Sequence, residues 1–187
     1  MEPFSHLSVL LSIILGLAIT QVLQGLGRLI QARERVRFYW PPVLWALVLL
    51  VIYVQSWWAM FGLRDHRDWT FLAFSVVVLQ TILLYLLAAL ALPDLTPEGP
   101  IDLRASYHGH SRWFYSTAAL LAVVSLGKDL ALSGHLPGRF NTAFHLVFIA
   151  TSTLAALTSA EWLHKAVTLG AAGGIGLYVA LLFSRLA

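Results

Sequence analysis

Long runs without charged residues alternate with short charged segments along this chain of 187 residues. An α-helix needs about 20 apolar residues to cross the hydrocarbon core of a bilayer, and the runs approach or exceed that length. They lack the alternation of polar and apolar positions that barrel strands show. We therefore expect an all-α membrane bundle, because only helices and closed barrels satisfy their backbone groups in lipid. Six transmembrane helices are predicted in a single domain, 1–187, at about residues 5–30, 40–63, 69–92, 112–133, 140–163 and 166–185.

Composition narrows the class of protein further. Charged residues make up 11% of the chain, whereas an ordinary soluble domain has about 25%. The chain has no cysteine, which excludes disulfides, thiolate catalysis, iron–sulfur clusters and cysteine zinc sites. The net charge of +3 is too small, and too confined to the loops, to indicate nucleic-acid binding.

Basic residues cluster directly after the first predicted helix. The positive-inside rule places this loop in the cytoplasm and therefore the N-terminus outside. The long connection 93–111 falls on the same side, where its basic groups would attract the headgroups of anionic membrane lipid. Its two histidines are too few for a metal site, which needs three or four ligands. The residues expected to face headgroups are Arg33, Arg35, Arg37, Arg104, His108, His110 and Arg112.

Small and polar residues recur at every fourth position of the first predicted helix. This spacing lets two helices approach closely in a membrane, and the glycine-rich last helix has the same property. The packing fits contacts within one chain or between copies in a homo-oligomer. A polar pathway along the first helix is the alternative, since Gln21 and Gln24 would cost free energy if they faced lipid. The residues expected to pack helices are Ser8, Ser12, Gly16, Gly170 and Gly174.

Polar side chains also lie inside the other predicted helices. Asn141, His145 and Ser152 share one face of the fifth, because they are separated by four and seven residues. A histidine inside a span is a functional hypothesis by default: His145 is suited to relaying protons or to binding haem or a metal. The alternative is a hydrogen bond to a neighbouring helix. The residues expected to line a ligand or ion pathway are Gln21, Gln24, Gln55, Gln80, Asn141, His145 and Ser152.

Two pairs of polar residues stand near predicted helix ends. Glu161 and His164 have the E-x-x-H spacing that binds metal in di-iron bundles, but the spans lack the further carboxylates of such a site. A solvated, charge-balanced helix end beside Lys165 is therefore predicted. Lys128, which precedes Asp129 near the outer end of the fourth helix, is expected to snorkel to the interface. The alternative is a vestibule or a proton site.

Several segments resemble small multi-pass bacterial membrane proteins to which no activity is assigned. They are residues 35–45, Gln55-Ser-Trp-Trp, Gly62-Leu-Arg-Asp, and Asp102-Leu-Arg-Ala-Ser-Tyr before Arg112-Trp-Phe. This resemblance implies a bacterial cytoplasmic (inner) membrane. The patch from Trp40 through Trp45 to Tyr53 is similar to tryptophan-rich sensory proteins, which bind porphyrins and sterol-like molecules but have five spans.

Three classes of function remain open. The first is an oligomeric channel or transporter for an ion or small molecule, favoured by the polar residues within spans and by the short loops. The second is a non-enzymatic protein that binds lipid or pigment, or an accessory subunit of a membrane complex. The third, a haem- or quinone-dependent enzyme, is the least favoured, because it calls for paired histidines on facing helices. Membrane lipid and further copies of the chain are the expected partners, and no particular cofactor is predicted.

Overall fold

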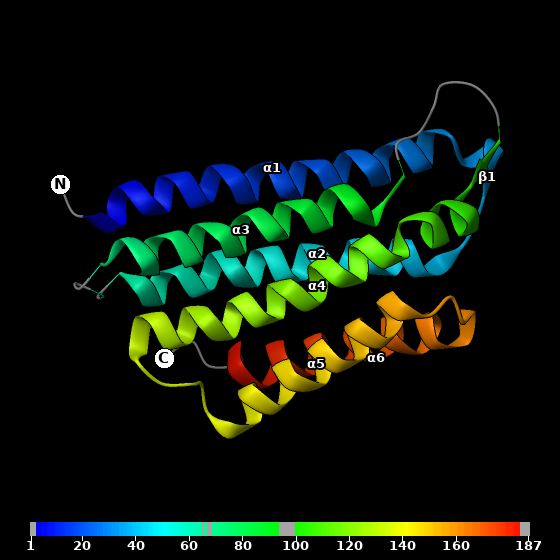
Figure 1. The fold of residues 1–187 in the computed structure, drawn as a ribbon. Helices are drawn as coiled ribbons and strands as arrows, with labels where there is room; N and C mark the ends of the chain where they lie inside the picture. The colour runs from blue at the N-terminus through cyan, green and yellow to red at the C-terminus, as the bar shows by residue number, and fades with distance from the viewer. Residues whose placement is uncertain (1–2, 65, 67–68, 94–99, 184–187) are drawn as a thin grey trace.

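The structure, a computed structural model, describes residues 3–64, 66, 69–93 and 100–183. This part of the chain contains six long α-helices: α1 (Pro3–Gln31), α2 (Trp40–Ala59), α3 (Phe71–Ala91), α4 (Leu103–Ser133), α5 (Arg139–Leu157) and α6 (Glu161–Phe183) (Figure 1). Short 3₁₀ helices cover Arg33–Arg35 and Met60–Leu63. Two short strands, β1 (Val36–Arg37) and β2 (Ile101–Asp102), pair in parallel. The predicted all-α class is confirmed, with this strand pair as the one addition in the described part.

Five helical segments are long and apolar enough to cross a membrane, counting only described residues: His6–Gln31, Trp40–Leu63, Phe71–Ala91, Leu103–Ser133 and Arg139–Leu157. α6 is 23 residues long, yet its described part is not among these segments. The end predicted for it, at residue 185, lies outside the described residues.

Five of the helices form a closed ring, in which each helix packs against the next. The order around the ring is α2, α3, α4, α5, α6 and back to α2. α1 lies outside the ring, where it packs against α2 and α3, and it runs alongside α3 in Figure 1. Its buried face carries an apolar stripe with helical spacing: Leu7, Leu11, Leu15, Ala18 and Val22. This stripe attaches α1 to the ring and leaves the interior of the ring to the other helices.

α4 begins at Leu103 instead of residue 112, which corrects the predicted connection. The Asp102 carboxylate accepts hydrogen bonds from the backbone N–H groups of Arg104 at 2.9 Å and Ala105 at 3.0 Å. This is the arrangement of an N-cap, which satisfies N–H groups that have no partner within the helix. The basic residues that made this stretch look like a loop therefore belong to the first turns of α4. Positions 94–99 of the predicted connection lie outside the described residues.

The boundary between α5 and α6 also differs from the prediction. α5 ends at Leu157 instead of residue 163, because Thr158 takes an extended conformation with φ −126° and ψ 152°. The chain resumes as α6 at Glu161 instead of residue 166. Glu161 and His164 therefore stand in the first turns of α6 and not at the end of the fifth helix.

The strand pair marks one end of the bundle, which we call the β end. Val36 lies opposite Ile101 and Arg37 opposite Asp102 in the parallel register. Arg37 Nη1 is 3.9 Å from Asp102 Oδ2, so a weak ion pair supports the register. The pair connects the segment after α1 to the start of α4.

Replacing Asp102 with alanine is expected to fray the start of α4 and to lower the unfolding temperature modestly, because two N–H groups lose their acceptor. The backbone hydrogen bonds from Ala105 and Arg104, aided by the charge of Arg37, hold the pKa of Asp102 below its ordinary value. The carboxylate therefore stabilises the fold above its unfolded-state pKa. That contribution is lost as the pH falls through the lowered folded-state pKa.

Thermal unfolding in detergent, followed by circular dichroism from neutral pH down to about pH 2, measures this effect. Asp102→Asn is the matched control, since an amide oxygen still caps the helix but does not titrate. We expect the variant to lose less stability than the wild type on acidification. An identical acid dependence in both proteins would contradict the role of the Asp102 charge.

Candidate functional site

A cavity of about 270 Å³ lies inside the ring of five helices. All five contribute to its lining, and none of the described residues of α1 does. The lining extends along α4 from Phe114 to Asp129, an axial distance of about 22 Å at 1.5 Å per residue. On α2 and the 3₁₀ helix that follows it, the lining extends from Trp45 to Leu63. The cavity is therefore elongated and runs parallel to the helices.

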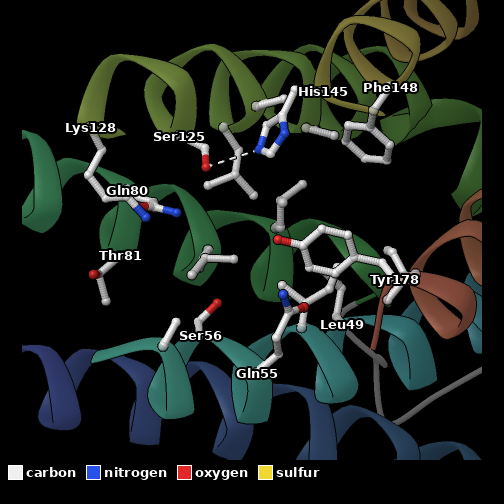
Figure 2. A pocket seen from close by; sticks show the side chains of 18 of the residues that line it. Leu49, Gln55, Ser56, Gln80, Thr81, Ser125, Lys128, His145, Phe148 and Tyr178 are labelled. Carbon is white, nitrogen blue, oxygen red and sulfur yellow. Dashed lines mark hydrogen bonds between the residues drawn. The ribbon is translucent and has the colours of Figure 1, made fainter. Parts of the chain in front are cut away.

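Polar side chains gather at the end of the cavity near the α4–α5 connection (Figure 2). The side chains of Lys128 and Asp129 remain 21% and 28% exposed there. This end, which we call the mouth, therefore communicates with the exterior. The polar lining residues are Gln55, Ser56, Gln80, Thr81, Ser125, Lys128, Asp129, Asn141, His145 and Tyr178.

The opposite end of the cavity, its floor, is apolar. The rings of Trp45 and Phe114 pack edge to face with their centroids 5.0 Å apart. A second cavity of about 10 Å³ touches the same two side chains and lies toward Tyr107 and His110. The aromatic pair therefore forms part of the wall between the two spaces. The apolar lining residues in this half are Trp45, Leu49, Leu84, Leu87, Phe114, Ala118, Leu121 and Phe148.

Two hydrogen bonds hold His145 at the cavity wall. Its Nδ1 lies 2.8 Å from the carbonyl oxygen of Asn141, and its Nε2 lies 3.2 Å from the hydroxyl of Ser125 (Figure 2). A carbonyl oxygen only accepts, so Nδ1 donates the proton, and Nε2 of the neutral ring accepts from Ser125. Both ring nitrogens are thus engaged. Coordination of haem iron or a metal by His145 would require one of these bonds to break.

Other polar groups of the cavity lack protein partners within the described part of the chain. Oδ1 of Asn141 is buried without a hydrogen bond. The amides of Gln55 and Gln80 make no hydrogen bond to any described residue. Lys128 Nζ approaches Asp129 Oδ1 only to 3.8 Å, which is too long for a hydrogen bond. Buried polar groups are normally hydrogen-bonded, so this cavity is suited to a polar guest or to water.

The residues predicted to line a pathway fall into two groups. Gln55, Gln80, Asn141 and His145 all line the cavity, from the three helices α2, α3 and α5. The remaining three, Gln21, Gln24 and Ser152, are not in its lining. The two glutamines lie on α1, outside the ring, and the serine hydroxyl is buried without a hydrogen-bond partner among the described residues.

The small residues predicted to pack helices differ in their surroundings. A Cβ added at Gly174 would lie 3.2 Å from Cε2 of Phe144. α6 and α5 therefore approach each other closely at this point. A Cβ on Gly16 or Gly170 would meet nothing within 4 Å. Ser12 is exposed and Ser8 is half-buried.

The basic residues predicted to face headgroups lie around the β end. Arg33, Arg35, Arg37, Arg104, His110 and Arg112 are exposed there. Arg104 forms an ion pair with Glu161, which also pairs with Lys165 at 2.8 Å. His108 is different, because it is half-buried and its ring centroid lies 5.5 Å from that of His164. The early start of α4 places this histidine against α6.

A buried hydrogen-bond chain next to the cavity floor has no evident signal in the sequence. Trp45 Nε1 donates to the Tyr115 hydroxyl at 3.2 Å. The hydroxyls of Tyr115 and Tyr107 are 2.7 Å apart, and the Tyr107 hydroxyl is 3.2 Å from Nδ1 of His164. His164 Nε2 donates to the carbonyl of Thr158 at 2.8 Å, so Nδ1 of the neutral ring accepts from Tyr107. The donors all point the same way, from Trp45 to Thr158.

This chain corrects the solvated helix end predicted for His164, whose side chain is completely buried. The prediction fits Glu161, which is partly exposed and balanced by two cations. His108 and His164 do face each other from α4 and α6, but both nitrogens of His164 are occupied. The described residues contain no group of three or more histidine or acidic side chains suited to a metal ion.

Comparisons with known proteins do not identify a family for this chain. No protein-family model, curated protein or solved structure matches the chain. The resemblance suggested by its short segments remains an expectation. What the fold and the site define is a bundle of long apolar helices around an elongated cavity with one polar end.

Proposed function

We propose that this chain is an integral membrane protein that binds a small amphiphilic molecule in the cavity inside the ring of helices α2 to α6. Many large apolar side chains face outward, including Phe71 at 86% and Leu157 at 76% exposed. Apolar surface of this extent suits contact with lipid. In this proposal α6 makes a sixth crossing. The arginine-rich β end lies in the bacterial cytoplasm, and the mouth opens to the opposite side.

The polarity gradient of the cavity is the observation that carries the proposal. Polar groups without protein partners line the mouth, and aromatic and aliphatic side chains line the floor. Ligand pockets are typically apolar, with a few polar groups that fix the orientation of the ligand. A guest with an apolar body and a polar head fits both halves. Binding of this kind needs no homo-oligomer, since one chain encloses the site.

Transport is the form of this function favoured by the second, smaller cavity. Trp45 and Phe114 touch both spaces, so a rearrangement of two rings would join them. In this proposal the chain is a carrier whose mouth is open and whose floor is closed. A channel or transporter for a small molecule remains the leading class, with binding alone as the second candidate.

Quenching of Trp45 fluorescence tests for a guest in the cavity. Dodecanol brominated at its terminal carbon has a polar head for the mouth and a heavy-atom quencher at the end of its chain. A peptide has three backbone bonds per residue, so an extended alkyl chain spans about 1.2 Å per bond. The bromine of a bound dodecanol therefore reaches the apolar half of the cavity. We expect saturable quenching of the protein in detergent, reversed by unbrominated dodecanol.

Trp45→Phe is the decisive variant, and it should remove the saturable part of the quenching. Trp58→Phe is the matched control, because Trp58 lies on the same helix with 44% of its surface exposed. Detergent-borne probe should quench Trp58 without saturation, so this variant should keep the saturable part. Equal saturable quenching in the wild type and in Trp45→Phe would overturn the proposed site.

A further inference from the structure

We infer that the guest is an amphiphile with an anionic head, a carboxylate, which pairs with Lys128 at the mouth while its chain extends toward Trp45. This deepens the proposed function, on which it rests, by naming the charge and the orientation of the guest.

Lys128 places a cation inside the cavity. It lies near the end of α4, its side chain lines the cavity, and it extends toward Gln80 (Figure 2). Only 21% of the side chain is exposed. An ammonium group with so little access to water needs a partner of opposite charge. Lys128, which the sequence predicts to snorkel to the interface, lies in the lining of the cavity.

The internal partner of Lys128 does not satisfy it. Asp129 is the next residue in the helix, and side chains of adjacent residues point about 100° apart. The resulting Nζ–Oδ1 distance is 3.8 Å, whereas charge-assisted hydrogen bonds measure about 2.7–2.9 Å. No described residue accepts a hydrogen bond from the ammonium, so its three N–H donors are available to a guest. Asp129 is the only acidic side chain among the described residues that line the cavity.

The neutral groups at the mouth complement a carboxylate. The amide of Gln80, toward which Lys128 extends, has free N–H donors, since it bonds to no described residue. A carboxylate only accepts, and its two oxygens offer about four lone-pair sites. Arg139, exposed at the start of α5 two residues before Asn141, adds a positive charge at the same end. That charge would attract anions from solution.

A neutral or cationic head fits the mouth less well. An alcohol would leave the Lys128 ammonium with only its distant contact to Asp129. A quaternary ammonium head would gain Asp129 but would meet the charge of Lys128, which is the less exposed of the two. The sign of the preferred head charge is thus the property that a binding experiment can measure.

Three probes with the same chain and different heads make this measurement: dodecanoate, dodecanol and dodecyltrimethylammonium. Each competes with the brominated dodecanol for the cavity, and the recovery of Trp45 fluorescence measures its binding at neutral pH in nonionic detergent. We expect dodecanoate to bind most tightly. Lys128→Met should weaken dodecanoate about tenfold, as loss of one charged hydrogen bond does, and leave dodecanol unchanged. Asp129→Asn should have the opposite effect and raise the affinity for dodecanoate, because it removes a charge that repels the carboxylate.

Arg139→Gln is the matched control, since it removes one positive charge from the same end but outside the cavity lining. It should leave the preference for dodecanoate in place. Equal binding of all heads, tightest binding of the cation, or an unchanged affinity for dodecanoate in Lys128→Met would overturn the anionic head. Those results would leave the proposed function standing. Failure of every probe to compete, including dodecanol, would instead overturn the proposed function itself.

Discussion

Replacing Leu121 with tryptophan is expected to abolish saturable binding of every amphiphile, whatever its head. Leu121 lines the cavity on α4, between the polar mouth and the aromatic floor. A larger side chain there occupies the path of the guest. Inserting extra atoms into a well-packed core costs about 1–3 kcal/mol, but here the indole enters existing space of about 270 Å³. Binding should therefore be lost with only a small change in stability.

The preceding residue gives the control for this prediction. Leu120 lies on the same helix with 49% of its surface exposed, so Leu120→Trp adds the same indole to the outside of the ring. Competition against the brominated dodecanol should remain at the wild-type level in that variant. Normal binding by Leu121→Trp, with an unaltered melting temperature, would show that guests do not use this cavity.

Replacing Trp45 with alanine should have the largest effect on stability. The indole is only 2% exposed, and it packs on Phe114 and Tyr115. Truncating a buried aromatic residue to alanine costs about 3–5 kcal/mol, and the Tyr115 hydroxyl also loses its donor. Part of the wall between the two cavities disappears as well. We expect a lower unfolding temperature and, in vesicles, faster leakage of a small polar solute.

Trp58→Ala provides the comparison, because Trp58 lies on the same helix but is 44% exposed. Substitutions at such positions usually change the free energy of unfolding by at most about 0.5 kcal/mol. Unfolding in detergent and dye release from vesicles should both distinguish the two variants. If Trp45→Ala melted together with Trp58→Ala, Trp45 could not be a structural part of the floor. If it were destabilised without leakage, the carrier form of the function would fail while the binding form survived.

The helical class was predictable because charge-free runs of this length are typical of helices that cross a membrane. The identity of the inward faces was not. In an ordinary soluble helix the apolar stripe marks the core, whereas lipid favours apolar residues on the outer face too. Gln24 and Gln55 therefore look alike in the sequence. The structure separates them, because the apolar stripe of α1 attaches to the outside of the ring and α2 forms part of it.

Helix boundaries near charged residues were the other source of error. Arg104, His108 and Arg112 gave the first turns of α4 the polarity of a loop, although Asp102 caps a helix there. His164 looked solvated because it stands between Glu161 and Lys165 in sequence. Its partners, Tyr107 on α4 and the carbonyl of Thr158, come together only when α6 packs into the bundle. The sequence around His164 does not predict that contact.

The one-way order of the buried hydrogen bonds has a consequence for energy coupling. A relay of protons needs each member to accept a proton on one side and release one on the other. The hydroxyls of Tyr107 and Tyr115 meet this condition, but the indole nitrogen of Trp45 is a donor only. The route from the β end thus stops at Trp45, so protons do not reach the cavity along these hydrogen bonds. A driving force for uptake would have to enter elsewhere.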